Sequence, residues 1–117
     1  MKKTPEEIAA LKAELLAKHG VPIRVVSLSD GRTFGFRPAG AADYRRWKAA
    51  QLGIAAGRNA EAVMASELAA RALCVHPADA GASFDALRDE DPALAGEIGD
   101  ALISRVGGKL EADLGEA

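Results

Sequence analysis

The chain has 117 residues, of which 49% are hydrophobic and 4% aromatic, and its net charge at pH 7 is −2. This length predicts one domain, and the single cysteine, Cys74, excludes an internal disulfide and fits a reducing compartment. Much of the apolar content is alanine, which buries little area, so we expect a thin core that is either modestly stable or completed by a partner.

The N-terminal stretch "TPEEIAALKAELLAKHG" predicts a helix over residues 5–19. Thr4 and Glu7 have the spacing of a capping box, and Gly20 suits the left-handed residue that ends a helix. The stretch lacks the apolar segment of a signal peptide, and no apolar run in the chain is long enough to cross a bilayer. We therefore expect a soluble, cytoplasmic protein with no membrane partner.

The next segment, "VPIRVVSLSDGRTFGFRP", predicts a β-hairpin whose turn contains Asp30 and Gly31. Phe34 and Phe36 alternate onto one strand face, with Gly35 on the other face. An isolated hairpin is marginally stable in water, so either helices cover the phenylalanine face or the hairpin edge pairs with another chain.

From about residue 41 the pattern predicts helices. The first carries Tyr44, Trp47, Leu52 and Ile54. The second, after the break at Gly57, places one apolar stripe along Val63, Met64, Leu68, Ala72 and Val75 and closes at His76-Pro77. Ser83 is expected to cap a short third helix, and the last runs from Asp91-Pro92 to Gly107-Gly108.

These elements define an α+β fold that is mainly α: an N-terminal helix, one β-hairpin, then a bundle of three to four helices. They form a single globular domain over residues 1–108, and residues 109–117 are expected to be a flexible acidic tail. The predicted core consists of Phe34, Phe36, Trp47, Val63, Leu68, Phe84, Leu94, Ile98 and Leu102.

Residues capable of catalysis or metal binding are sparse. One cysteine and two histidines are too few for a structural zinc site, and Cys74 is expected to lie on or beside the buried stripe of the second bundle helix as a small apolar group. His76 is expected to help close that helix, where a cation is favourable. No nucleophile has a recognisable acid–base partner, so we predict a non-enzymatic protein with no catalytic residue, cofactor or metal.

Charge is unevenly distributed along the chain. Residues 37–58 hold five basic side chains and one acidic one, whereas residues 77–117 hold ten acidic and three basic ones. This asymmetry either steers a charged partner or lets the two halves attract each other. The segment "YRRWK" combines aromatic and basic residues, as nucleic-acid-binding surfaces do. The acidic overall charge argues against that function.

The order of these motifs, "V.SLSDG.TFGFRP", "YRRW", "LCVHP" and "F..L....P.L...I...I...VG", resembles that of small phage tail assembly chaperones over roughly residues 21–108. The resemblance implies binding of the tape-measure protein, a long helical protein kept soluble in the bacterial host until the tail tube assembles around it. Two alternatives remain open: a structural tail or head component that assembles with copies of itself through the hairpin edge, and a small nucleic-acid-binding regulator that uses Arg45, Arg46 and Lys48. The expected partner-binding residues, on the hairpin and the following helix, are Phe34, Phe36, Arg37, Tyr44, Arg45, Trp47 and Lys48.

Overall fold

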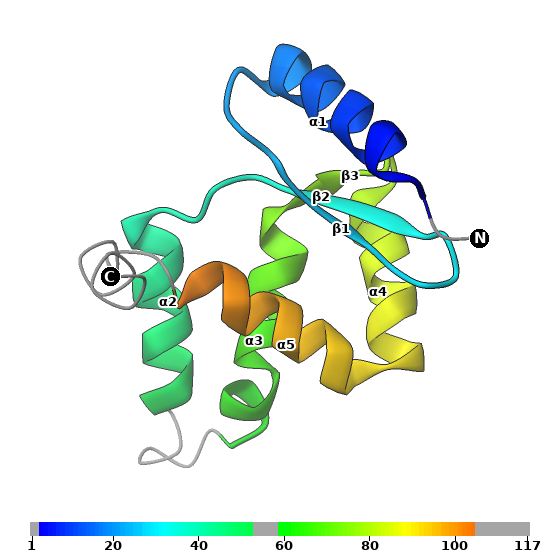
Figure 1. The fold of residues 1–117 in the computed structure, drawn as a ribbon. Coiled ribbons are helices and arrows are strands. Elements are labelled where there is room, and N and C mark those ends of the chain that lie inside the picture. The colour runs from blue at the N-terminus through cyan, green and yellow to red at the C-terminus, as the bar shows by residue number, and fades with distance from the viewer. Residues whose placement is uncertain (1–2, 53–58, 105–117) are drawn as a thin grey trace, which may run out of the picture.

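The computed structural model describes residues 3–52 and 59–104, with the backbone alone described for residues 59–63 (Figure 1). The described part is mainly helical with one small antiparallel sheet, which confirms the predicted fold class. Its elements in chain order are α1 (Pro5–His19), β1 (Arg24–Ser27), β2 (Thr33–Phe36), α2 (Ala41–Leu52), α3 (Asn59–Leu73), β3 (Cys74–His76), α4 (Ala80–Glu90) and α5 (Pro92–Ile103).

Helix α1 begins and ends as its sequence predicts. The Thr4 hydroxyl accepts a hydrogen bond from the Glu7 amide at 3.2 Å, and the Glu7 carboxylate accepts one from the Thr4 amide at 2.9 Å. Gly20 ends the helix with a φ of 75°, a conformation that costs glycine little because it has no Cβ.

The hairpin is also confirmed, with Val26 opposite Phe34 and Ser27 opposite Thr33. The Leu28 amide donates to the Arg32 carbonyl at 2.8 Å, and the Gly31 amide donates to the Leu28 carbonyl at 3.0 Å. These bonds close a three-residue loop in which Gly31 has a φ of 96°.

A third strand, β3, was not predicted. It pairs antiparallel with β2, so that Gly35 lies opposite His76 and Phe36 opposite Cys74. The expected helix ending at His76-Pro77 is therefore wrong: α3 ends at Leu73, and Cys74 lies in a strand rather than on a helix. Because β2 lies between β1 and β3, both of its edges are paired, and only β1 and β3 form outer edges of the sheet.

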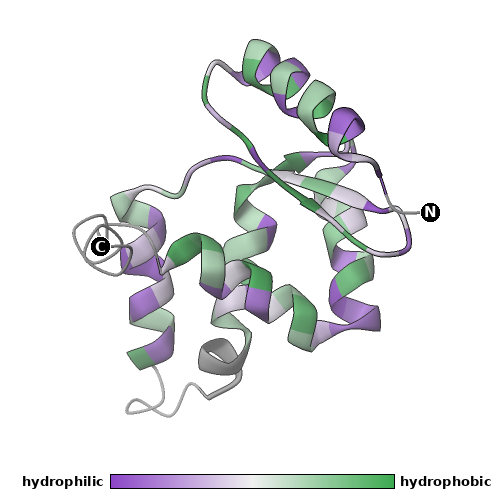
Figure 2. Ribbon diagram, viewed as in Figure 1, coloured by the Kyte–Doolittle hydropathy of each residue, from purple (hydrophilic) through white to green (hydrophobic). Residues whose placement is uncertain are grey.

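Helices cover both faces of this sheet (Figure 1). On the α1 side, a Cβ at Gly35 would lie 3.0 Å from the side chains of Leu15 and Ile23, so the backbone of β2 approaches them closely. On the other side, Phe34 and Phe36 each meet the Phe84 ring edge-to-face, with centroids 5.7 and 5.8 Å apart. Figure 2 shows hydrophobic residues gathered where the strands, α3 and α5 meet.

The predicted core is partly confirmed. Phe34, Phe36, Phe84 and Ile98 are buried. Trp47, Leu94 and Leu102 are half-buried, and the last two pack against the core. The prediction for Leu68 is wrong because its side chain is 43% exposed. The side chain of Val63 lies outside the described residues.

Helix α3 buries a different face from the predicted stripe. Met64 and Leu68 are exposed, whereas Ala65, Ala70 and Leu73 are buried. Helix α5 crosses α3 closely at Gly99, where a Cβ would overlap the carbonyl oxygen of Ser66. At this crossing a small residue lies on the inner face of α3 because the two helix backbones come close together, whereas the large side chain of Leu73 is buried farther along the helix.

The last two helices differ in how well their starts were predicted. Helix α4 begins at Ala80, so Ser83 lies inside it and donates its hydroxyl to Asp79 instead of capping the helix. Helix α5 begins after Asp91 as predicted, and the Asp91 carboxylate accepts from the Leu94 amide at 3.1 Å. The predicted end at Gly107-Gly108 and the tail 109–117 lie outside the described residues. No helix in the described ranges is long and apolar enough to cross a membrane.

Candidate functional site

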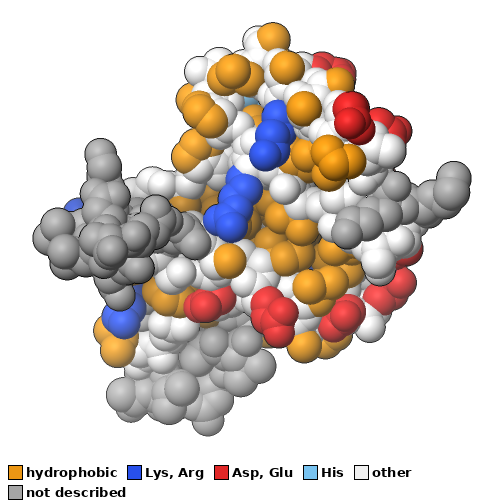
Figure 3. Space-filling model, in the orientation of Figure 1, with side chains coloured by type: hydrophobic (Ala, Val, Ile, Leu, Met, Phe, Trp, Pro, Cys, Tyr) orange, Lys and Arg blue, Asp and Glu red, His pale blue; other side chains and the backbone are white. Residues whose placement is uncertain are grey.

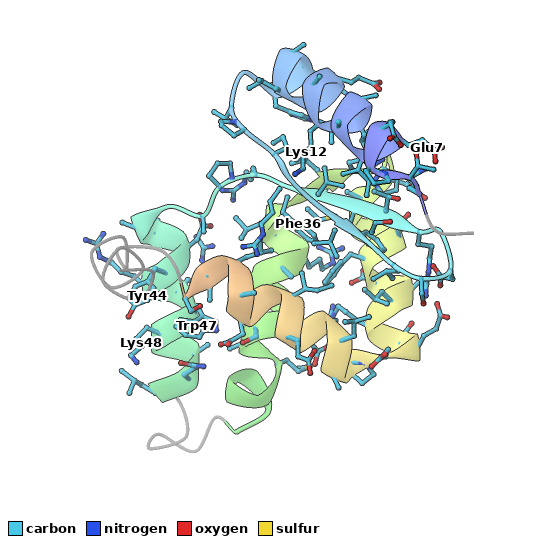
Figure 4. The ribbon with its side chains drawn as sticks, in the orientation of Figure 1. Glu7, Lys12, Phe36, Tyr44, Trp47 and Lys48 are labelled. Atoms are coloured by element: carbon cyan, nitrogen blue, oxygen red, sulfur yellow. The ribbon has the colours of Figure 1, made fainter. Side chains whose placement is uncertain are left out.

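The predicted partner-binding residues fall into two groups. Phe34 and Phe36 are 2% and 0% exposed, so their rings belong to the core and form no part of the surface (Figure 4). Tyr44, Trp47 and Lys48 lie together on α2, at the edge of the molecule (Figure 4). The surface candidates are therefore on α2 rather than on the hairpin.

Arg37 ties the end of the hairpin to the start of α2. Its guanidinium donates to both carboxylate oxygens of Asp43, at 3.2 and 3.3 Å, and the Gly40 amide donates to the same carboxylate at 2.8 Å. These hydrogen bonds, led by that from Arg37, hold the pKa of Asp43 below its usual value. Arg46 lies 3.6 Å from this carboxylate as well.

The basic segment 37–48 makes its described ion pairs within itself. The described ion pairs of Arg37 and Arg46 are made locally with Asp43, not with the acidic C-terminal part of the chain. Arg45 and Lys48 are exposed, and neither has an ion-pair partner within the described residues. Arg37 therefore has a structural role, whereas Arg45 and Lys48 lie on the exposed side of α2.

Trp47 connects α2 to α3. Its indole Nε1 donates to the Ser66 hydroxyl at 3.0 Å, and its ring lies 5.7 Å from that of Tyr44, centroid to centroid. The two aromatic residues share a face, as their spacing predicts. Helix α2 nevertheless buries none of its side chains fully, so it rests on α3 without entering the core.

A groove runs between these two helices, with a cavity volume of about 120 Å³. This volume is below the 300–1,000 Å³ typical of small-molecule sites, so it suits a single side chain of a partner better than a cofactor. The α2–α3 groove is lined by Asp43, Arg46, Trp47, Ala50, Ala65, Leu68, Ala69 and Ala72.

Sequence reasoning missed the contribution of α3 to this surface. Leu68 was assigned to the core and Ala72 to the same apolar stripe, while Ala65 and Ala69 were not singled out because alanine is common throughout the chain. The available signal was the second group of apolar residues on α3: Met64 and Leu68 lie outside the buried set of Ala65, Ala70 and Leu73.

Cys74 and His76 are both half-buried in β3, and the Cys74 thiol donates to the His76 carbonyl at 3.3 Å. Burial raises the pKa of the Cys74 thiol to about 11, and burial is also the main cause that lowers the pKa of His76. A thiol with such a pKa is almost entirely protonated at neutral pH and is a poor nucleophile. Within the described residues, no group of three or more His, Cys, Asp or Glu side chains could hold a metal ion.

Comparison with known proteins adds no relative: no family model, curated protein or solved structure matches this chain.

Proposed function

We propose that this protein is a non-enzymatic tail assembly chaperone, which binds helical segments of a tape-measure protein and keeps them soluble until the tail tube forms. The observation that carries the proposal is the α2–α3 groove, an apolar surface that the described residues leave open. The order of the sequence motifs, which resembles that of tail assembly chaperones, indicates the tape-measure protein as the partner.

The groove suits a helix with an apolar stripe. Its floor includes the methyl groups of Ala65, Ala69 and Ala72, which allow another helix to approach closely, while Trp47 and Leu68 form its larger apolar walls. An amphipathic helix places anchors at i, i+3, i+4 and i+7, and one of them fills a cavity of this size. Covering such a stripe prevents the long helices of a tape-measure protein from associating with one another.

One basic side chain belongs to the groove itself. Arg46 lines it beside Trp47, and its guanidinium lies 3.6 Å from the Asp43 carboxylate. Arg45 and Lys48 are exposed on the opposite side of α2, because the helical spacing places them away from the residues that line the groove. Affinity therefore comes from the apolar contact with the groove.

The test is co-expression of this protein with the tape-measure protein of the same tail gene cluster. We expect the long helical partner to stay soluble and to co-purify with the wild-type chain. Leu68→Asp places a charge in the groove wall and should weaken binding by about tenfold or more, the effect of losing a central apolar anchor.

Leu16→Asp is the matched control. Leu16 lies on α1, away from the groove, and is 47% exposed against 43% for Leu68. It should bind as the wild type does, because the same substitution at a similar exposure leaves the groove intact. A partner that remains insoluble and unbound with the wild-type chain, or equal effects of the two substitutions, would sink the proposal.

A further inference from the structure

Strand β1 has an open edge. The strand order is β1-β2-β3, so β1 is hydrogen-bonded to β2 on one side only. Among the described residues, no backbone hydrogen bond outside the strand ladder reaches Val25 or Ser27. An outer strand of this kind is a template to which another extended chain can add.

The hairpin turn shows which groups point outward. The Leu28 amide bonds to the Arg32 carbonyl, so this pair is hydrogen-bonded across the hairpin. Hydrogen-bonded pairs alternate along an antiparallel ladder, which turns the backbone groups of Val26 toward β2. The N–H and C=O groups of Val25 and Ser27 therefore point to the open edge.

An apolar groove runs beside this edge, between β1 and α5, with a cavity volume of about 190 Å³. Val26 lies opposite Phe34, on the face of the sheet that packs against α3, α4 and α5. Its side chain therefore forms one wall of the groove. Figure 3 shows hydrophobic side chains gathered between β1 and α5. The β1–α5 groove is lined by Arg24, Val26, Leu94, Glu97, Ile98, Ala101 and Leu102.

The two walls of the β1–α5 groove carry opposite charges. Arg24 is exposed on β1 and has no ion-pair partner within the described residues. Glu97 is exposed on the α5 wall. In Figure 3, Lys and Arg side chains lie above the hydrophobic band, and a row of Asp and Glu side chains lies below it.

We propose that the β1–α5 groove binds an extended peptide segment of a partner protein, which adds to the sheet as a strand beside β1. The outward groups of Val25 and Ser27 would pair with the peptide backbone, and every second side chain would enter the groove over Val26 and Leu102. Strand addition combined with a side-chain groove is an established mode of peptide recognition.

The same geometry specifies the chemistry of the peptide. Its groove-facing positions are aliphatic or aromatic, because the walls are apolar, and a carboxylate near one end pairs with Arg24. A strand is favoured over a helix because only an extended backbone satisfies the open edge. This proposal goes beyond the chaperone function and does not depend on it, since the α2–α3 groove is built from other residues.

The test uses ¹⁵N-labelled protein and a pool of eight-residue synthetic peptides with Val, Ile, Leu or Phe at alternate positions, Thr between them and Asp or Glu at the ends. We expect the amide resonances of Val25 and Ser27 to shift, and their hydrogen exchange to slow about tenfold or more at saturation. Peptides methylated at alternate backbone nitrogens should not bind, because they cannot pair with the strand.

Two variants locate the site. Ser27→Pro removes an outward N–H group and leaves the ladder to β2 intact, because proline is tolerated at such edge positions. In this variant the peptides should no longer slow the hydrogen exchange of the Val25 amide. Ala101→Glu charges the groove wall at an exposed position and should weaken binding about tenfold. Its matched control is Ala93→Glu, at a position that is also exposed on α5 but does not line the groove, and this variant should bind normally.

Three outcomes would overturn the proposal. One is that no peptide of the pool shifts Val25 or Ser27. A second is binding that survives both Ser27→Pro and Ala101→Glu in variants whose circular dichroism is native. The third is dimerisation of the chain alone that Ser27→Pro abolishes, since the occupant of the edge would then be a second copy.

Discussion

Replacing Gly99 by alanine tests the closest contact between helices in this fold. Helices α3 and α5 form the most extensive contact between elements of the described structure. At their crossing, a Cβ on Gly99 would overlap the carbonyl oxygen of Ser66. That oxygen belongs to the backbone of α3, so no side-chain rotation relieves the overlap, and the helices must separate.

The magnitude follows from two opposing effects. Overpacking a tight interior costs typically 1–3 kcal/mol, and a rigid backbone neighbour places this site toward the upper end. Alanine recovers about 1 kcal/mol through its better helix propensity. We therefore expect Gly99→Ala to lower the free energy of unfolding by about 2 kcal/mol, which corresponds to a fall in Tm of about 8 °C for a chain of this size.

Gly96→Ala on the same helix provides the control. A Cβ at Gly96 would meet only the Glu67 side chain, at 4.0 Å, which is ordinary contact. This variant gains helix propensity without strain, so its Tm should rise by up to about 4 °C. Circular dichroism at 222 nm during thermal and urea unfolding measures both variants. A Gly99→Ala protein as stable as Gly96→Ala would refute the close crossing of α3 and α5.

Two further predictions concern titrating groups. Asp43→Asn should destabilise the protein at pH 7, because the Arg37 hydrogen bond lowers the pKa of Asp43 in the folded state. A lowered pKa contributes stability above the ordinary aspartate range, so the wild-type advantage in urea unfolding should shrink as pH falls below about 4; an advantage independent of pH would contradict this. Cys74 should be alkylated by iodoacetamide at pH 8 about a hundredfold more slowly in the native than in the urea-unfolded protein, since burial raises its pKa from 9.0 to about 11. Equal rates would show that the thiol is accessible.

The local signals in the sequence predicted the elements that local chemistry controls. The capping box of Thr4 and Glu7, the Asp30-Gly31 turn and the Asp91-Pro92 helix start each involve residues within a few positions of one another. Such interactions hold in almost any tertiary context, so α1, the hairpin and the start of α5 were predicted correctly.

The missed features depend on partners that are distant in the chain. Strand β3 is stabilised by pairing with β2, roughly forty residues earlier, while its three residues locally continue a helical pattern. The inward face of α3 is selected by the close approach of α5 at Gly99, which favours small residues over Leu68. The α2–α3 groove was not predicted: Trp47 on its α2 side was named as a partner-binding residue, which stays a prediction, and Leu68 on its α3 side was assigned to the core.

The limited attachment of helix α2 has a consequence for how its sequence can change during evolution. It buries none of its side chains fully, and Arg37–Asp43 and Trp47–Ser66 are its main described polar attachments. Substitutions at its exposed positions, such as Arg45 and Lys48, should therefore leave folding nearly unaffected. Asp43 and Trp47, by contrast, both attach α2 and line the groove, so a substitution that reshapes the groove at either residue should also loosen the helix.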